Sequence, residues 1–188
     1  MWSFTRATPA RGCTKVLPSF LALINFLENY KTAFALKRLD YIESIFSDDA
    51  VIITGRVLRT AEQTQEFKNI QQTMDNQVVH GNVLYTRMSK EHYIKRLKNS
   101  FASKEWINIK FGNTQVEASR QEEMYAITLL QDYYSSNYGD HGYLFLLIDA
   151  TDEKYPLIKV RTWQPESAGS TPFTMGDYDR LTNGMINK

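Results

Sequence analysis

The spacing of apolar residues changes along the chain from a helical to a strand period. From Phe20 to Phe34, apolar side chains recur every three or four residues, which predicts an amphipathic helix from about 18 to 36. The following stretch, Leu39 to Gly55, reads LDYIESIFSDDAVIITG. Its first half predicts a short helix from about 39 to 46, and its β-branched run predicts a strand from about 50 to 55. We interpret Asp48 and Asp49, between the two, as a helix-to-strand turn rather than a catalytic carboxylate pair, because neighbouring strand residues point to opposite faces.

The middle and the end of the chain add further helices and strands. Thr60 and Gln63 form a capping-box pattern before a third predicted helix, and Ser89 is placed to cap a fourth. The stretch 76–88 between these helices predicts a short hairpin. From Trp106 onward the period is two, which predicts strands near 107–111, 125–129, 143–150 and 157–163. Helices followed by antiparallel strands predict an α+β domain with the helices packed on one face of a curved sheet.

Length and composition fit one folded domain. The 188 residues are enough for a single core, and we predict a flexible leader at 1–16, a domain at 17–165 and a C-terminal tail at 166–188. The hydrophobic content of 43% is that of a globular protein. Twenty-two basic and 21 acidic residues give a formal charge of +1, so the chain as a whole is not attracted to nucleic acid, which we do not expect as a partner.

The sequence shows no spacing of cysteines or histidines that is typical of a metal centre. Cys13 is the one cysteine, which excludes an internal disulfide and a cysteine-based zinc site. The three histidines, His80, His92 and His141, lie too far apart in the sequence to form a local ligand pair. We therefore expect neither a metal nor a cofactor.

The N-terminal third bears on localisation. We do not expect a membrane span, because no apolar stretch is long enough. We favour a cytoplasmic location, with the helix from about 18 retained because the next segment needs it as a packing partner. The alternative is export, since Arg6, Arg11 and Lys15 precede an apolar run, as in a signal peptide.

The stretch LDYIESIFSDDAVI resembles the pattern Leu-Asp-x-Ile-x-x-Leu-Phe-x-Asp-Asp-Ala, which closes the helical hairpin in many members of the nuclear transport factor 2 family. That family includes SnoaL-like proteins and steroid delta-isomerases. The segments 91–111 and 142–165 also resemble uncharacterised members from Bacteroidetes-type bacteria. The resemblance implies a cone, in which helices cover the open side of a strongly curved, mainly antiparallel sheet and leave an apolar pocket. Because this pocket serves isomerases, dehydratases, cyclases and plain binding proteins alike, the fold does not name a reaction.

The same resemblance implies two site residues. Isomerases of the family use a tyrosine on the first helix and a carboxylate base on the first strand, and the shared pattern puts these positions at Tyr30 and Thr54. Tyr30 matches the family. Thr54 is a neutral hydroxyl that cannot act as a carboxylate base, which argues against steroid-type isomerisation.

Alternation in the last three predicted strands suggests a further polar group. Asp132 and Tyr134 share a face of one strand, and Asp149 lies on a face of the next. Arg161 and Trp163 share a face of the last strand, so Asp149 and Arg161 would pair beside Trp163 if the faces coincide. The interpretation that we favour is a cross-strand ion pair on a solvent or dimer face, worth well under ~1 kcal/mol. The candidate ligand-binding residues are Tyr30, Thr54, Tyr134, Arg161 and Trp163.

Two functions are consistent with these residues. The first is a non-catalytic binding domain that forms a homodimer through its sheet and takes a small apolar ligand or a protein partner. The second is a cofactor-independent, SnoaL-like isomerase, dehydratase or cyclase acting on a small apolar or polyketide-like substrate. In that enzyme Tyr30 would donate a hydrogen bond, and Asp132 or Asp149 would act as the acid-base group and would have to line the cavity. The missing carboxylate at Thr54 favours the first function.

Overall fold

The computed structural model describes residues 16–58, 76–80, 82–118, 123–166 and 171–176. The elements in chain order are α1 (Val16–Ala35), α2 (Leu39–Ser44), β1 (Phe46–Val57), β2 (Gln77–His80), β3 (Val83–Ser89), α4 (Lys90–Ala102), β4 (Ile107–Ala118), β5 (Met124–Ser135), β6 (Tyr138–Asp149) and β7 (Leu157–Pro165). The predicted α+β class is confirmed. The third predicted helix, after Thr60, lies outside the described residues, and the predicted domain boundaries stay predictions.

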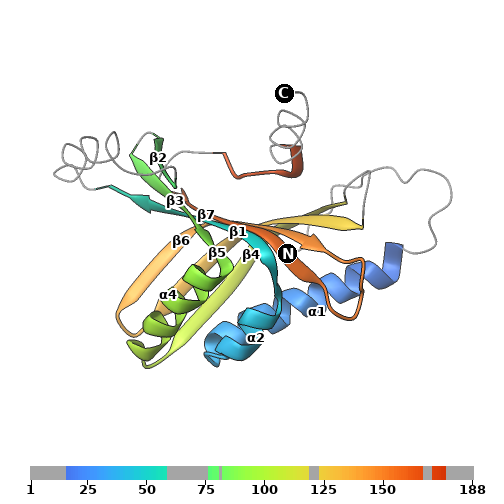
Figure 1. Ribbon diagram of the computed structural model, residues 1–188, viewed down its shortest axis with the longest axis horizontal. Coiled ribbons are helices and arrows are strands. Elements are labelled where there is room, and N and C mark those ends of the chain that lie inside the picture. Colours follow the sequence, from blue (N-terminus) through green and yellow to red (C-terminus); the bar gives the residue numbers. More distant parts are fainter. Residues whose placement is uncertain (1–15, 59–75, 81, 119–122, 167–170, 177–188) are drawn as a thin grey trace.

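The seven strands form one curved sheet in the order β2-β3-β1-β7-β6-β5-β4 (Figure 1). All neighbouring strands pair antiparallel except β1 and β7, which are parallel. The stretch predicted as a hairpin does form one, from β2 and β3. Because β7 lies between β1 and β6, the last strand of the chain pairs with the first at the centre of the sheet.

The helices cover one face of the sheet (Figure 1). On α1 the buried side chains recur at helical spacing, at Leu23, Leu27, Tyr30 and Phe34, and they pack against inward-facing strand residues. At the start of α4, the backbone N–H of His92 donates to the Ser89 side chain, so Ser89 is the predicted cap. None of the helices in these ranges combines the length and the apolar character that crossing a bilayer requires.

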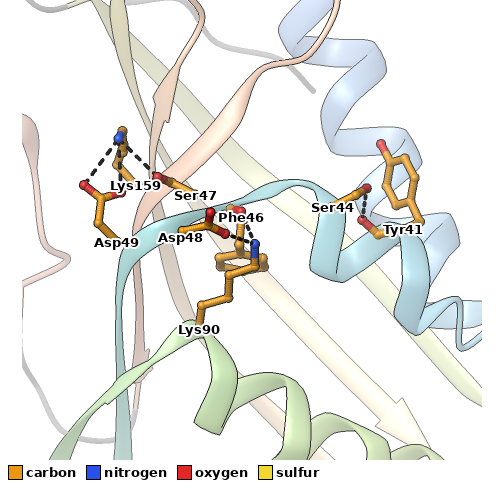
Figure 2. A network of polar contacts seen from close by, with 8 residues as sticks. All are labelled: Tyr41, Ser44, Phe46, Ser47, Asp48, Asp49, Lys90 and Lys159. Atoms are coloured by element: carbon orange, nitrogen blue, oxygen red, sulfur yellow. Dashed lines mark hydrogen bonds and ion pairs between the residues drawn. The ribbon is translucent and has the colours of Figure 1, made fainter.

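The strand β1 begins at Phe46, earlier than predicted, because lysines from other elements bind its polar start. Lys90 of α4 donates to the Phe46 carbonyl and pairs with Asp48, in both cases at 2.8 Å. Lys159 of β7 pairs with Asp49 on the other side of the strand, at 3.1 Å (Figure 2). The prediction that these aspartates occupy a helix-to-strand turn was therefore wrong, whereas the prediction that they do not converge on one reacting atom is confirmed.

A short segment near the C-terminus covers part of the other sheet face (Figure 1). Phe173 packs on Phe145 of β6, with ring centroids 4.9 Å apart, and Met175 belongs to the same apolar cluster. The backbone N–H of Phe173 donates to the Gln164 side chain at 2.7 Å, and the Thr128 hydroxyl donates to the Phe173 carbonyl at 3.3 Å. The segment 171–176 therefore lies on the face of the sheet opposite the helices, which we call the outer face.

Candidate functional site

A cavity of about 350 Å³ lies between the helices and the inner face of the sheet. Its walls come from α1, α4, β1, β5, β6 and β7, so it is the pocket of the cone. The lining residues are Phe34, Thr54, Tyr93, Leu97, Ser100, Lys104, Gln131, Tyr133, Tyr138, Asp140, Arg161 and Trp163. The volume is near the lower end of the range for small-molecule sites, roughly 300–1,000 Å³.

Strand alternation explains which residues reach this cavity. On β5, Ile127 and Leu129 are buried under the helices, so Gln131 and Tyr133 point to the same side. On β7 the register shifts, so that Val160 faces Leu147 while Ile158 faces Ile148. Lys159 is the extra residue of a β-bulge. The bulge leaves Ile158 and Arg161 both on the inner face and turns Lys159 outward toward Asp49.

Arg161 is the unusual residue of the cavity, because it is a buried cation without a carboxylate partner. Its exposed fraction is 7%, and its Nε–H donates to the Tyr30 hydroxyl at 3.2 Å. The guanidinium carbon lies 5.2 Å from the centroid of the Tyr93 ring, which gives a cation–π contact. Among the described residues, no carboxylate pairs with Arg161, and its Nη1 has no hydrogen-bond partner.

Arg161 and Tyr93 influence each other's pKa inside the cone. Burial raises the pKa of the Tyr93 hydroxyl, and the Arg161 charge opposes that rise without cancelling it. Burial by itself would lower the pKa of Arg161, but its interactions with Tyr30 and Tyr93 outweigh burial and the pKa is raised. The guanidinium therefore stays charged, and its positive charge faces the cavity.

Gln131 and Asp140 are the amide and the carboxylate among the described lining residues of the cavity. Gln131 is buried, with 5% of its surface exposed, and its side-chain oxygen has no hydrogen-bond partner among the described residues. At the rim, Asp140 accepts hydrogen bonds from the Tyr138 hydroxyl and the His141 backbone N–H, each at 2.9 Å. Asp140 is the one carboxylate among the described lining residues, and these two donors already occupy it.

The structure brings together part of the site predicted from the sequence. Thr54, Arg161 and Trp163 line the cavity, and Tyr30 lies fully buried directly behind Arg161. Tyr134 does not join them: it is 46% exposed on the opposite face of β5 from Gln131 and Tyr133.

The two aspartates considered as acid-base groups lie away from the cavity. Asp149 shares the outer face of β6 with Phe145, and its carboxylate accepts from the Thr151 backbone N–H at 3.0 Å. Hydrogen bonding to the Thr151 side chain, together with this backbone bond, holds the pKa of Asp149 below its ordinary value. The suggested pairing of Asp149 with Arg161 is thus wrong, because the bulge at Lys159 puts the two side chains on opposite faces.

Asp132 binds His141 instead of facing the cavity. His141 Nδ1 contacts the Asp132 carboxylate, and its Nε2 lies 2.7 Å from Glu166. The hydrogen bond to Asp132, supported by the charges of both acids, raises the pKa of His141. Residues 139–142 belong to β6, and the hairpin turns at Ser136 and Asn137. Asp132 and His141 are cross-strand partners for that reason.

Sequence reasoning missed Gln131, Asp140 and the site role of Tyr93. A signal for Gln131 exists, because it is a polar residue continuing the inward series of Ile127 and Leu129. Tyr93 lies on the buried face of α4, but only the tertiary arrangement puts its ring against Arg161. Within the described part of the chain, no group of three or more potential ligand residues is placed to hold a metal ion.

Comparisons with known proteins agree with the cone. No protein-family model matches the sequence, and no curated protein matches it. Among solved structures, nuclear transport factor 2 from Cryptosporidium parvum superposes with a TM-score of 0.51 at 6% identity, over 75% of this chain and 89% of that one. A candidate scytalone dehydratase from Novosphingobium aromaticivorans superposes with a TM-score of 0.53 at 11% identity, over 79% and 85% of the two chains.

A third similar structure is Bdellovibrio bacteriovorus Bd1075, with a TM-score of 0.54 and 12% identity. The match covers 82% of this chain but 41% of that one, so the present chain spans less than half of the Bdellovibrio protein. At such low sequence identities, structural similarity is evidence for a shared fold and not for a shared function. The cone of helices over a curved sheet, the inner pocket and these superpositions agree with the resemblance found in the sequence: the chain has the nuclear transport factor 2-like fold.

Proposed function

We propose that this chain is a binding module that holds a small amphipathic ligand in its cone and performs no catalysis there. The supporting observation is the composition of the cavity: aromatic walls with a few buried, unsatisfied polar groups are typical of small-molecule sites. Acid-base catalysis needs a group of suitable pKa within hydrogen-bond reach of the substrate. Thr54 replaces the strand carboxylate, and Asp132 and Asp149 lie on the outer face, so the groups suggested for an enzyme are not in place.

The cavity is tested with a neutral planar probe, 2-naphthol, titrated into the protein and followed through the NMR signal of the Trp163 indole N–H. We expect saturable binding, and we expect Thr54→Phe to weaken it by at least ~10-fold because a new ring would occupy the cavity. Ile53→Phe is the matched control, because its side chain points to the other side of β1. Absence of saturable binding, or equal losses in the two variants, would contradict the proposal.

A homodimer through the sheet belongs to the same proposal. The segment 171–176 already covers the outer face around Phe145, so the part left for a partner is the other end of β5, where Tyr134 is 46% exposed. Exposed aromatic residues of this kind are enriched at subunit interfaces.

We expect Tyr134→Lys to convert a dimer into a monomer in sedimentation velocity, because it places a charge in the apolar part of the interface. Tyr155→Lys is the control: Tyr155 is 73% exposed, in the segment between β6 and β7. A wild-type protein that is monomeric at high concentration would exclude the dimer and leave ligand binding untouched.

A further inference from the structure

The unsatisfied polar atoms of Arg161 and Gln131 indicate which polar groups a ligand of this cavity would carry. Each side chain is at least nine-tenths buried, each lines the cavity, and each has a polar atom without a partner among the described residues. The unsatisfied atom of Arg161 is a donor with positive charge, and that of Gln131 is an acceptor. A buried polar group without a partner costs free energy, so the pair marks places that a ligand would fill.

The surroundings of Arg161 fix the guanidinium without neutralising it. Tyr30 accepts a hydrogen bond at 3.2 Å, and Tyr93 contributes its ring face, but neither residue is a carboxylate. Asp140, the one carboxylate among the described lining residues, is engaged by Tyr138 and His141 at the rim. Burying a charge is costly unless it is paired. An anion that enters the cavity would therefore form the ion pair with Arg161 that the protein itself does not provide.

We propose that the ligand of this cavity is a small aromatic carboxylic acid, bound as its carboxylate by Arg161 and flanked by the aromatic walls. This proposal rests on the binding function proposed above and specifies its ligand. A guanidinium is planar and offers parallel donors that match a carboxylate, and one carboxylate balances its single charge. Phe34, Tyr93 and Trp163 supply apolar and aromatic surface for the rest of the molecule, and the Gln131 oxygen can accept from a hydroxyl or amine on it.

The experiment compares two probes of nearly equal shape, 2-naphthoate and 2-naphthamide, by isothermal titration calorimetry at constant ionic strength. Because a hydrogen bond to a charged group contributes about 1.5–3 kcal/mol, we expect the acid to bind roughly 10- to 100-fold more tightly than the amide. In the wild-type protein the acid alone should also shift the NMR signal of the Arg161 Nε–H. Equal affinities would overturn the carboxylate proposal while leaving the binding function intact, and failure of both the acid and the amide to bind would overturn both proposals.

Two variants assign the preference to Arg161. Arg161→Met should abolish the preference for the acid while the amide still binds, because methionine has a similar length without charge. Arg161→Lys retains the charge but not the planar fork, and should show an intermediate preference; it serves as the second variant if Arg161→Met does not fold. Lys159→Met is the matched control, since it removes a cation from the outer face of the same strand. A preference for the acid that survives in Arg161→Met, or that is lost in Lys159→Met, would contradict the assignment.

Discussion

Replacing Tyr30 with alanine is expected to lower the free energy of unfolding by about 3–5 kcal/mol, as for other large aromatic-to-alanine changes in cores. Tyr30 is fully buried and its ring packs against Phe34, with centroids 4.8 Å apart. Its loss would leave a void at the base of the cone and remove the acceptor of the Arg161 Nε–H. The measurement is urea denaturation followed by circular dichroism, compared with the wild-type midpoint and slope.

Two further variants separate the ring from the hydroxyl. Tyr30→Phe retains the packing and leaves the Arg161 Nε–H without its acceptor, so we expect a smaller loss of about 1–3 kcal/mol. Tyr155→Ala applies the alanine substitution to a tyrosine that is 73% exposed and should change stability by no more than about 0.5 kcal/mol. If Tyr30→Ala proved as mild as Tyr155→Ala, Tyr30 would not be the core residue that the structure describes.

Gly142→Ala is expected to destabilise the protein by about 1–3 kcal/mol, as overpacking of a buried site does. Gly142 of β6 pairs with Pro165 of β7, and a Cβ atom there would lie 2.2 Å from the Gln164 carbonyl oxygen. That oxygen belongs to the backbone, so the end of β7 would have to move away from β6. Trp163 lines the cavity and lies just before this point in β7, so the wall of the cavity would move as well. We therefore expect Gly142→Ala to weaken 2-naphthol binding in addition to lowering stability.

Gly139→Ala is the matched control in the same strand. An added Cβ at Gly139 would meet its nearest atom, in the Tyr134 ring, at 3.5 Å, which is an ordinary contact. We expect a neutral or slightly stabilising effect, of up to about 1 kcal/mol, because alanine restricts the unfolded chain. Thermal unfolding of the two variants in parallel measures the difference. Equal melting temperatures would mean that β6 and β7 are not as close at Gly142 as the structure describes.

Local patterns in the sequence were enough to predict most of the fold. The apolar stripe of α1 and the cap at Ser89 depend on interactions within a few residues, and both are present. Thr54, identified through the family resemblance, and Trp163, identified by alternation, both line the cavity.

What could not be predicted depends on contacts between distant elements. Alternation says which residues share a face, but it does not say which face is the inner one, so Tyr134 was grouped with the site although it lies outside. The bulge at Lys159 changes the alternation within β7, and no local signal in the sequence marks it. The early start of β1 depends on Lys90 and Lys159, which are 42 and 110 residues away from their aspartate partners.

The cavity is complete only when β7 has joined the sheet. Arg161 and its hydrogen-bond partner Tyr30 are 131 residues apart, and β7 joins β1 to β6 at the centre of the sheet. A chain that has not yet placed its last strand has two separate groups of strands, β2-β3-β1 and β6-β5-β4, and no guanidinium in the cone. Closing the chain over such sequence separations is entropically costly and slows folding. A ligand held by Arg161 would bind only the completed sheet, and would therefore stabilise the native state over any state in which β7 is not in place.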